Sequence, residues 1–261
     1  MEIVVCVKPS PEAESRLRAT SSGAAYDADG VKFVLAGYEE SAVEQGLLLR
    51  QEVPGSKLHA VALGPAGRVD EVLRACMALG CDSATAVDAP TTPLEDPVAT
   101  ARGLAEAITA RGAHDLVLFG KQAGDDEEGI VGAATAELLG LPFVGFVLQL
   151  HADAAKGQLT FRRSVEQGVE SWQAPLPLAV GLQQAWNDPR TATLPAILRS
   201  RKAPIARHAA AVATAAGPRS VSEKFALPPP RQGARMIEYR TPQEAAEKLV
   251  RLLREEAKVF P

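Results

Sequence analysis

Residues 58–80, LHAVALGPAGRVDEVLRACMALG, decide the fold, because they read as a strand, a turn and a helix in succession. The apolar run Leu58–Leu63 is typical of a strand buried on both faces. Gly64-Pro65 ends that strand, and the apolar spacing predicts a helix from about Val69 to Leu79 that closes at Gly80. This order is the start of a βαβ unit.

The same alternation continues in both directions along the chain. The other predicted strands cover residues 2–7, 84–87, 116–119 and 178–182. The other helices are predicted at residues 38–51, within residues 93–111, and from about residue 128 to residue 139. Alternating strands and helices favour right-handed crossovers and a parallel sheet with helices on both faces. The expected fold class is therefore α/β, with a three-layer, Rossmann-like sheet.

Three regions depart from the alternation. Residues 8–30 are rich in turn residues and can hold a short hairpin. Residues 146–150, 159–163 and 169–173 read as short antiparallel strands that extend one edge of the sheet. Residues 206–235 contain Ala-rich and Pro-rich sequence without an amphipathic period, which fits either an extended arm on another subunit or a flexible linker.

The chain ends in a predicted amphipathic helix from Pro242 to about Lys258. Its apolar face is formed by Ala246, Leu249, Val250 and Leu253. We therefore expect two parts, an α/β domain at residues 1–205 and an arm with its helix at residues 206–261.

Composition excludes several classes of function. The 261 residues are 46% hydrophobic and 23% charged, which is ordinary for a globular protein, and the net charge of −4 gives no general attraction to nucleic acid or to anionic membranes. No apolar run approaches the roughly 18 residues of a transmembrane helix. Cys6, Cys76 and Cys81 lack C-x-x-C spacing, so neither a disulfide framework nor a metal site is expected. With no targeting pattern at the start of the sequence, a cytoplasmic location is expected.

Four loops follow predicted strands at the edge of the sheet where open parallel sheets bind their ligands. Residues 120–132, GKQAGDDEEGIVG, are the richest, because a strand runs into glycines and then into a helix whose free N–H groups can hold a phosphate. Glycines at such a place also occur for tight packing alone. The segment lacks the G-x-x-x-x-G-K-[ST] pattern of a Walker A loop.

Residues 186–195, WNDPRTATLP, form a turn followed by the start of a short helix. Trp186 is either an anchor for a binding partner, because Trp is enriched among the residues that carry interface affinity, or a side chain folded back into the core. No catalytic group accompanies it.

Several of these motifs, in this order, resemble the electron transfer flavoprotein β subunit. They are N-D-P-R-T-A-T-L-P at 187–195, G-K-Q-A-G-D-D at 120–126, V-x-V-K at 5–8 and D-x-x-G-V-K at 27–32. Gly64-Pro65 and the run Ala78–Asp82 agree, so the resemblance covers nearly the whole chain. It implies a fold of the adenine-nucleotide-binding type, an α subunit that binds the redox-active FAD, and an electron carrier without bond-making catalysis of its own.

The resemblance also implies roles for particular residues. AMP would lie against Cys6, Ala36, Gly37, Tyr38, Leu63, Gly120, Lys121, Gln122, Ala123, Asp125, Asp126, Gly129, Ile130, Val131 and Gly132. Partner dehydrogenases would be recognised by Trp186, Asn187, Pro189, Arg190 and Leu194, and the flavin of the α subunit would face Arg163 and Glu170. The arm and the final helix would pack on the α subunit.

The sequence departs from the family pattern at the expected AMP site. Ile130 and Val131 stand where the family usually has Gln and Thr or Ser, and Ala36 stands where Asn is common. The four acids of residues 125–128 suit a helix N-terminus but repel phosphate. AMP remains the first expectation, and a weakened, altered or empty site stays open. Trp186 replaces a residue that is commonly Leu.

The function expected from the resemblance is to carry electrons from flavin dehydrogenases, such as acyl-CoA dehydrogenases, to a quinone oxidoreductase or a similar acceptor. One alternative is a bifurcating β subunit that binds a second FAD and accepts hydride from NADH. A second alternative is an ATP pyrophosphatase or a stress-protein-like module. Pyrophosphatases usually carry S-G-G-x-D-S after the first strand, where this chain has Val7-Lys8-Pro9-Ser10-Pro11.

Overall fold

The computed structural model describes residues 1–23, 25–88, 96–153, 156–184, 188–210, 219–220, 223–229 and 233–260. The chain forms two compact units, Met1–Phe225 and Ala226–Pro261. Each unit is described by itself.

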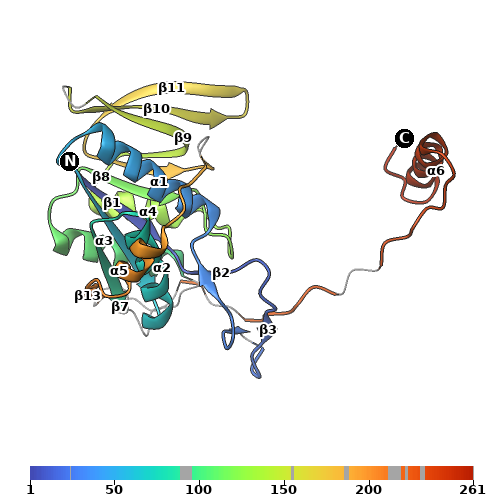
Figure 1. Cartoon of the computed structure of the whole chain (residues 1–261), viewed down its shortest axis with the longest axis horizontal. Coiled ribbons are helices and arrows are strands. Elements are labelled where there is room, and N and C mark those ends of the chain that lie inside the picture. Colours follow the sequence, from blue (N-terminus) through green and yellow to red (C-terminus); the bar gives the residue numbers. More distant parts are fainter. Residues whose placement is uncertain are drawn as a thin grey trace. The chain divides into compact units, whose positions relative to one another are not determined.

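A largely parallel sheet runs through the first unit (Figure 1). Among the described residues its strand order is β11-β10-β9-β12-β8-β1-β6-β7-β13. The strands are β1 (Glu2–Val7), β6 (Lys57–Gly64), β7 (Ser83–Asp88), β8 (Leu116–Gly120), β9 (Phe143–Asp153), β10 (Gln158–Val165), β11 (Gly168–Pro175), β12 (Leu178–Leu182) and β13 (Ala206–Ala209). From β9 to β13 all neighbours are parallel, whereas β10 and β11 are antiparallel.

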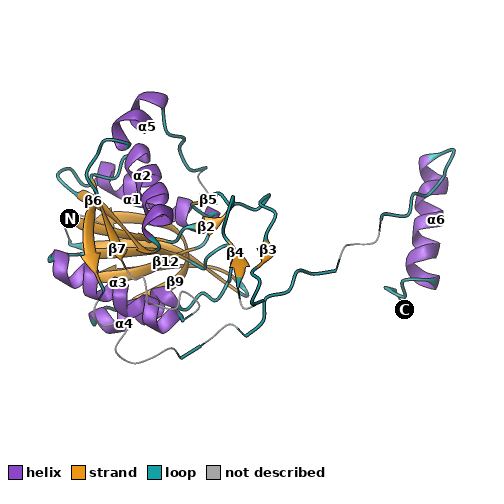
Figure 2. Cartoon of the chain, turned by 90° about the horizontal axis from the view of Figure 1, so that it is seen from below, coloured by secondary structure: helices purple, strands orange, loops and turns teal. Residues whose placement is uncertain are grey.

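Helices cover both faces of this sheet, as Figure 2 shows. Helices α1 (Gly37–Glu52) and α2 (Ala66–Leu79) pack on one face, and α3 (Pro97–Arg111) and α4 (Val131–Leu139) pack on the other. The short helix α5 (Leu194–Ser200) packs on α2. The predicted three-layer α/β fold is confirmed.

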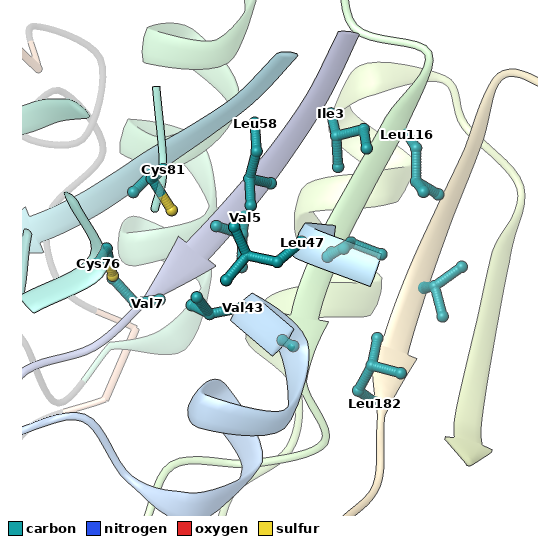
Figure 3. Packing of buried hydrophobic residues seen from close by; sticks show 14 of the residues in the cluster. Ile3, Val5, Val7, Val43, Leu47, Leu58, Cys76, Cys81, Leu116 and Leu182 are labelled. Atoms are coloured by element: carbon teal, nitrogen blue, oxygen red, sulfur yellow. The ribbon is translucent and has the colours of Figure 1, made fainter. Parts of the chain in front are cut away.

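The central strand β1 shows why the sequence folds in this way. Ile3, Val5 and Val7 are buried in the core that lies under α1 and α2 (Figure 3), whereas Val4 and Cys6 are buried in the core on the opposite face. Successive side chains of a strand point to opposite faces, so a strand covered on both sides must be apolar at every position.

The turn-rich N-terminal region contains two small ladders. β2 (Ser10–Pro11) pairs with β5 (Phe33–Val34), and β3 (Arg18–Ala19) pairs with β4 (Tyr26–Asp27). The second ladder is the hairpin predicted within residues 8–30.

Several predicted boundaries are wrong. Helix α4 begins at Val131 rather than at residue 128, because Glu127 and Gly129 have φ angles of 54° and 66°, which no right-handed helix accommodates. Helix α3, by contrast, lies within the range predicted to contain it and begins at Pro97, where the carboxylate of Asp96 accepts from the N–H groups of Val98 and Ala99 at 2.9 and 3.0 Å. The strand expected at 146–150 extends over Phe143–Asp153 and is parallel to β12 on one side, so only its other side is antiparallel.

The segment expected to be an arm begins differently. Its first residues form β13, which pairs in parallel with β7 at the edge of the sheet. The first compact unit also extends to Phe225, whose N–H donates to the carbonyl of Gly23 at 2.7 Å. The structure therefore divides the chain about twenty residues later than the expected boundary after residue 205.

The second unit contains α6 (Pro242–Glu255), close to the predicted final helix. Thr241 accepts from the N–H of Glu244 at 3.2 Å, and the Glu244 carboxylate accepts from the N–H of Arg240 at 3.0 Å, so the helix starts with reciprocal caps. None of its residues is buried, and Leu249 and Val250 are about half exposed (47% and 46%).

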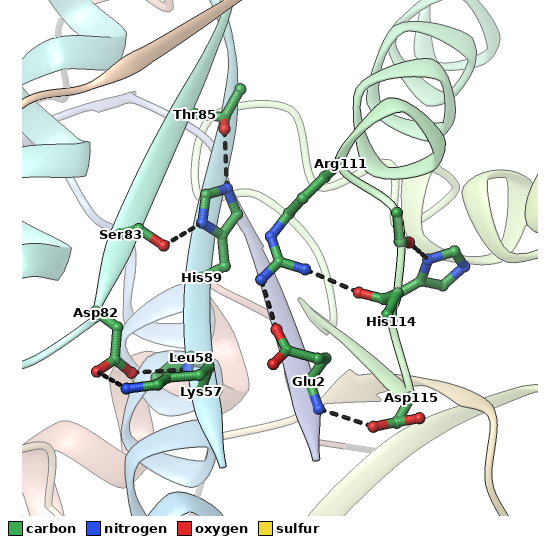
Figure 4. Close-up of polar contacts among 12 residues, drawn as sticks. Glu2, Lys57, Leu58, His59, Asp82, Ser83, Thr85, Arg111, His114 and Asp115 are labelled. Carbon is green, nitrogen blue, oxygen red and sulfur yellow. Dashed lines mark hydrogen bonds and ion pairs between the residues drawn. The ribbon is translucent and has the colours of Figure 1, made fainter. Parts of the chain in front are cut away.

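Polar side chains at the amino ends of the parallel strands bind one another (Figure 4). Arg111 donates to the carboxylate of Glu2 at 2.7 Å. The carboxylate of Asp82 accepts from the backbone N–H of Leu58 at 2.9 Å. The ring of His59 lies 2.7 Å from the Ser83 hydroxyl and 2.9 Å from the Thr85 hydroxyl, and burial lowers its pKa to about 4.

Candidate functional site

A pocket of about 90 Å³ opens at the carboxyl ends of β1, β6 and β8. Strands β6 and β7 lie on one side of β1 and β8 lies on the other, so the chain changes direction across the sheet at β1. Ligands of open α/β sheets bind at such a switch point. The predicted site residues that line the pocket are Cys6, Leu63, Gly120, Lys121, Gln122, Ala123, Asp126, Gly129, Ile130, Val131 and Gly132.

Other predicted residues lie next to the loop after β8 and do not line the pocket themselves. A Cβ atom added at Gly120 would lie 3.0 Å from Cβ of Tyr38, so only glycine permits this approach of β8 to α1. A Cβ at Gly124 would lie 3.2 Å from Cβ of Ala36. Gly37 is the first residue of α1 and, like Ala36 and Tyr38, is not part of the pocket lining.

Lys8 lines the pocket and binds two acids of the loop after β8. Its ammonium donates to the carboxylates of Asp125 and Asp126 at 2.7 and 2.6 Å. Burial alone would lower the pKa of Lys8, but these hydrogen bonds outweigh it and the pKa lies above its usual value. The sequence contained Lys8 in its V-x-V-K motif without revealing this role, because the two acids lie far away along the chain.

Glu39 is a second pocket residue that sequence reasoning missed. Its residue is only 4% exposed, and its Oε2 atom has no hydrogen-bond partner among the described residues. Burial raises the pKa of this carboxyl to about 8. The helical pattern of residues 38–51 gave no signal, because Glu39 and Glu40 look alike in a first helical turn.

The pocket contains no activated nucleophile among the described residues. Burial raises the pKa of the Cys6 thiol well above its usual range, so the thiolate is not available. The Lys121 ammonium lies 5.7 Å from the ring centre of Tyr38 and 5.4 Å from that of Phe146, which holds it by cation–π contacts. This chemistry suits binding rather than bond cleavage.

The residues present do not fit the phosphate of AMP. The N-terminus of α4 offers free N–H groups, but Ile130 and Val131 supply apolar side chains there. Asp126 and Glu128 line the same pocket, and desolvation together with the charge of Asp126 raises the pKa of Glu128, a sign of crowded acids. Lys8 is already bound to two carboxylates.

The predicted recognition loop is only partly described. Trp186 and Asn187 lie outside the described residues. Leu194 is 68% exposed and Pro189 is half-buried. The guanidinium of Arg190 binds Glu44 on α1 in a bidentate pair, with Nε 2.8 Å and Nη2 2.7 Å from the two carboxylate oxygens.

This pair gives Arg190 a local role that sequence reasoning missed. The Arg190 N–H also donates to Glu44, at 3.2 Å, and Glu44 is buried. Burial raises the pKa of Glu44, but the hydrogen bonds from Arg190 lower it more, so the pKa lies below its usual value. Arg190 therefore fixes the loop to α1.

The helix that follows the loop is fixed independently. Arg74 on α2 donates to the backbone carbonyls of Ser200 and Arg201 at 2.7 and 2.8 Å, at the end of α5. The chain is thus held to α1 before α5 and to α2 after it.

Arg163 and Glu170, predicted to face a flavin, are directly opposite on β10 and β11. Arg163 Nε lies 3.7 Å from the Glu170 carboxylate, too far for a hydrogen bond, and it has no hydrogen-bond partner among the described residues. The indole N–H of Trp172 donates to the same carboxylate at 2.9 Å. The two predicted residues are therefore brought together, on the antiparallel extension of the sheet.

Two kinds of feature are missing from the described part of the chain. No group of three or more His, Cys, Asp or Glu side chains is arranged to hold a metal ion there. None of its helices has the length and apolar character needed to span a membrane.

Comparisons with known proteins give a consistent result. Residues 24–213 match the electron transfer flavoprotein domain. The chain is 30% identical to the electron transfer flavoprotein subunit beta of Syntrophomonas wolfei, over 99% of this chain and 98% of that protein. It is 32% identical to the human subunit beta over 77% and 78% of the two chains. It is also 30% identical to a caffeyl-CoA reductase-Etf complex subunit of Acetobacterium woodii, over 98% of each chain.

Proposed function

The chain belongs to the electron transfer flavoprotein β-subunit family, and from this premise we propose that it serves as one subunit of a heterodimeric electron carrier. An α subunit holds the redox-active FAD in this proposal. Electrons arrive from a flavin dehydrogenase, such as an acyl-CoA dehydrogenase, and leave to a quinone oxidoreductase or a similar acceptor. The β subunit makes and breaks no covalent bonds, and the complex works in the cytoplasm.

The observation that carries the proposed partner is the exposed apolar face of α6. Leu249 and Val250 remain about half exposed although the helix is well capped. An amphipathic helix gains most of its stability by burying its apolar face against another element. We propose that the α subunit covers this face and the chain that precedes it.

The clamped loop supports the proposed contact with dehydrogenases. The Glu44–Arg190 pair fixes the backbone at residue 190, and Leu194, further along the chain, is exposed. A fixed backbone lowers the entropy lost when a partner binds. In this proposal Trp186 is the anchor that enters an apolar pocket of the dehydrogenase.

Arg163 and Glu170 are proposed to face the flavin of the α subunit. The Arg163 side chain is 33% exposed beside the Glu170 carboxylate, so its guanidinium can donate to a neighbouring group. In FAD-binding complexes the protein contributes such donors and charges to tune the cofactor.

The test is to purify the chain after coexpression with its α subunit and to measure what acid denaturation releases. One FAD per heterodimer is the expected result. If the chain purifies as a soluble monomer that does not bind the α subunit, the proposal is wrong.

A second experiment tests the docking loop. Trp186→Ala should slow flavin reduction by the partner dehydrogenase at least tenfold, while photochemical reduction of the same flavin is unchanged. Equal rates of dehydrogenase-driven reduction in both proteins would remove Trp186 from the docking site.

The alternative is a bifurcating β subunit that binds a second FAD and accepts hydride from NADH. Two FAD per heterodimer, with reduction by NADH, would favour it. The apolar Ile130 and Val131 at the start of α4 count against a second dinucleotide, which needs polar partners for its diphosphate.

A further inference from the structure

The cross-strand pair of Arg163 and Glu170 is held open, although its placement favours a closed ion pair. The two residues lie directly opposite each other on β10 and β11, where long side chains of opposite charge normally meet. An arginine and a carboxylate so placed frequently form two short hydrogen bonds. Here Arg163 Nε lies 3.7 Å from Glu170 Oε2, which is too far for a hydrogen bond.

The indole of Trp172 binds the carboxylate oxygen that faces Arg163. Trp172 follows Glu170 by two residues on β11, so both side chains lie on the same face of the sheet. Its Nε1–H donates to Glu170 Oε2 at 2.9 Å, and this is the same atom that lies 3.7 Å from Arg163 Nε. The indole therefore competes with the guanidinium for this oxygen and holds the carboxylate beyond the hydrogen-bond reach of Nε.

The strand on the other side of Arg163 is irregular at the same level. The pairing of β9 with β10 shifts register between Arg162 and Arg163, where Arg163 pairs with Val147. Phe146, the residue before Val147, has a φ angle of 61°. A bulky residue rarely adopts this left-handed backbone, and β-bulges redirect individual side chains beside functional sites. The direction of Arg163 is therefore set by the fold and does not depend on its ion pair with Glu170.

These contacts leave the guanidinium with unused donors. Arg163 Nε is buried without a hydrogen-bond partner among the described residues, whereas the side chain as a whole is 33% exposed. The exposure therefore lies at other atoms of the side chain, and a guanidinium carries further N–H donors at its Nη atoms. Trp172 is itself 53% exposed, and tryptophan is enriched among the residues that carry interface affinity. Both side chains are thus accessible to a partner.

We propose that Trp172 is a positioning residue that keeps the Glu170 carboxylate away from Arg163, so that the guanidinium is available to the flavin of the α subunit. This inference rests on the proposed function, in which Arg163 and Glu170 face that flavin. A flavin that accepts an electron gains negative charge, and a positively charged donor beside it favours the reduced form. The dehydrogenase supplies the electron and the acceptor removes it, so Trp172 and Arg163 are chemically unchanged.

Removing only the indole N–H should close the ion pair. In Trp172→Phe an aromatic ring remains, but Glu170 loses its donor and can approach Arg163. A guanidinium that makes two hydrogen bonds to a carboxylate of its own chain has fewer donors for the flavin. Reduction of the flavin should therefore be less favourable in this variant than in the unchanged protein.

The experiment measures the one-electron potential of the FAD in the purified heterodimer by spectroelectrochemical titration. Trp172→Phe should disfavour reduction by about three- to tenfold, and a tenfold change corresponds to about 59 mV for one electron. Glu170→Gln should shift the potential the other way, because it removes the negative charge beside the guanidinium. Adding Trp172→Phe to Glu170→Gln should change nothing further, because no charged carboxylate is left to close on Arg163.

Gln173→Ala is the matched control. Gln173 is the neighbour of Trp172 on β11, and its side chain donates to the Thr160 hydroxyl across the strands at 3.4 Å on the opposite face of the sheet. Its loss should leave the potential unchanged. A shift in Gln173→Ala as large as that in Trp172→Phe would show a general disturbance of the strand and overturn the proposal.

Two further results would overturn the positioning role. One is an unchanged potential in Trp172→Phe. The other is a Trp172→Phe shift that persists in the Glu170→Gln background, because the indole would then act without the carboxylate.

The FAD content of the heterodimer separates this inference from the proposed function. A heterodimer that holds one FAD, but whose potential is the same with Trp172→Phe, keeps the electron carrier and overturns only the role of Trp172. A heterodimer without FAD overturns the electron carrier, and the inference with it.

Discussion

The two ends of the parallel sheet use charged residues in opposite ways. At the amino end the carboxylates of Glu2, Asp82 and Asp115 each accept from a cation or a backbone N–H of a neighbouring strand or helix. At the carboxyl end two acids share Lys8, and one oxygen of Glu39 has no hydrogen-bond partner among the described residues. A satisfied network fixes strands in place, whereas an unsatisfied one is prepared for something that is added later.

The two ends of the sheet also differ in the direction of pH change that ionises their buried groups. Glu39 at the carboxyl end is buried in its acid form, and His59 at the amino end is buried in its neutral form. Ionising either group inside the fold is unfavourable, but one ionises as the pH rises and the other as it falls.

The largest effect is expected from Glu39. Its pKa rises from 4.5 to about 8 on folding, so its acid form is retained in the fold, and stability falls as the pH rises through this interval. Each pKa unit corresponds to about 1.4 kcal/mol, so the heterodimer should lose on the order of 3 kcal/mol of unfolding free energy between pH 5 and pH 8. Urea denaturation of Glu39→Gln should lack this loss. An equal slope in both proteins would show that the carboxyl is not buried.

His59 should act in the opposite sense with a somewhat smaller effect. Its pKa falls from 6.5 to about 4 on folding, so the stability it contributes is present above pH 6.5 and is lost as the pH falls towards 4. We expect a loss of about 2 kcal/mol between pH 6.5 and pH 4.5 that is absent in His59→Gln. Urea denaturation checks this, with His114→Gln as the control because that half-buried ring lies at the same end of the sheet. The control should keep the loss.

Removing one acid from each end compares the two networks directly. Asp82→Ala leaves the N–H of Leu58 without its side-chain acceptor, whereas the guanidinium of Arg50 keeps the carbonyl of Gly80, and the loss should cost about 1–2 kcal/mol of unfolding free energy. Asp126→Ala leaves Lys8 bound to Asp125, and because the Asp126 side chain is 37% exposed the change should alter stability by about 0.5 kcal/mol or less. Similar losses measured by thermal unfolding would contradict the contrast between the two ends.

Glu44 differs from the acids that line the pocket, because both of its carboxylate oxygens accept hydrogen bonds from Arg190. Glu44→Gln should lower the overall stability by only about 1 kcal/mol, since Arg190 stays partly exposed. Amide hydrogen exchange of residues 188–194 should nevertheless speed up several-fold. Glu52→Gln, on the same helix but bound to β9, should leave that exchange unchanged. If both variants behave alike, the pair does not hold the loop.

The fold could be predicted from the sequence because each strand and helix carries a local pattern. Leu116–Phe119 is apolar at every position, and Leu58–Leu63 is apolar at every position except His59, as expected for strands buried on both faces. Helix starts were less predictable, because the start of α4 depends on the left-handed backbone of Glu127 and Gly129, which no side-chain pattern reveals. β13 was missed because its pairing with β7 joins segments distant in the chain.

The candidate site was predictable only in part. The loop after β8 carried its own glycine and acid pattern, and most of its residues line the pocket. Lys8, Glu39 and Glu44 were missed because their roles arise from partners more than eighty residues away or from burial alone. Trp186 and Asn187, which lie outside the described residues, remain predictions.

The two anchors on either side of α5 also bear on how such a protein can evolve. Glu44 holds the chain at Arg190, and Arg74 holds it after Ser200, so both ties belong to helices of the scaffold. Neither tie involves the side chain at position 186. In the docking role proposed for Trp186, natural variation can therefore exchange that residue, and with it the choice of electron donor, while the two ties are kept.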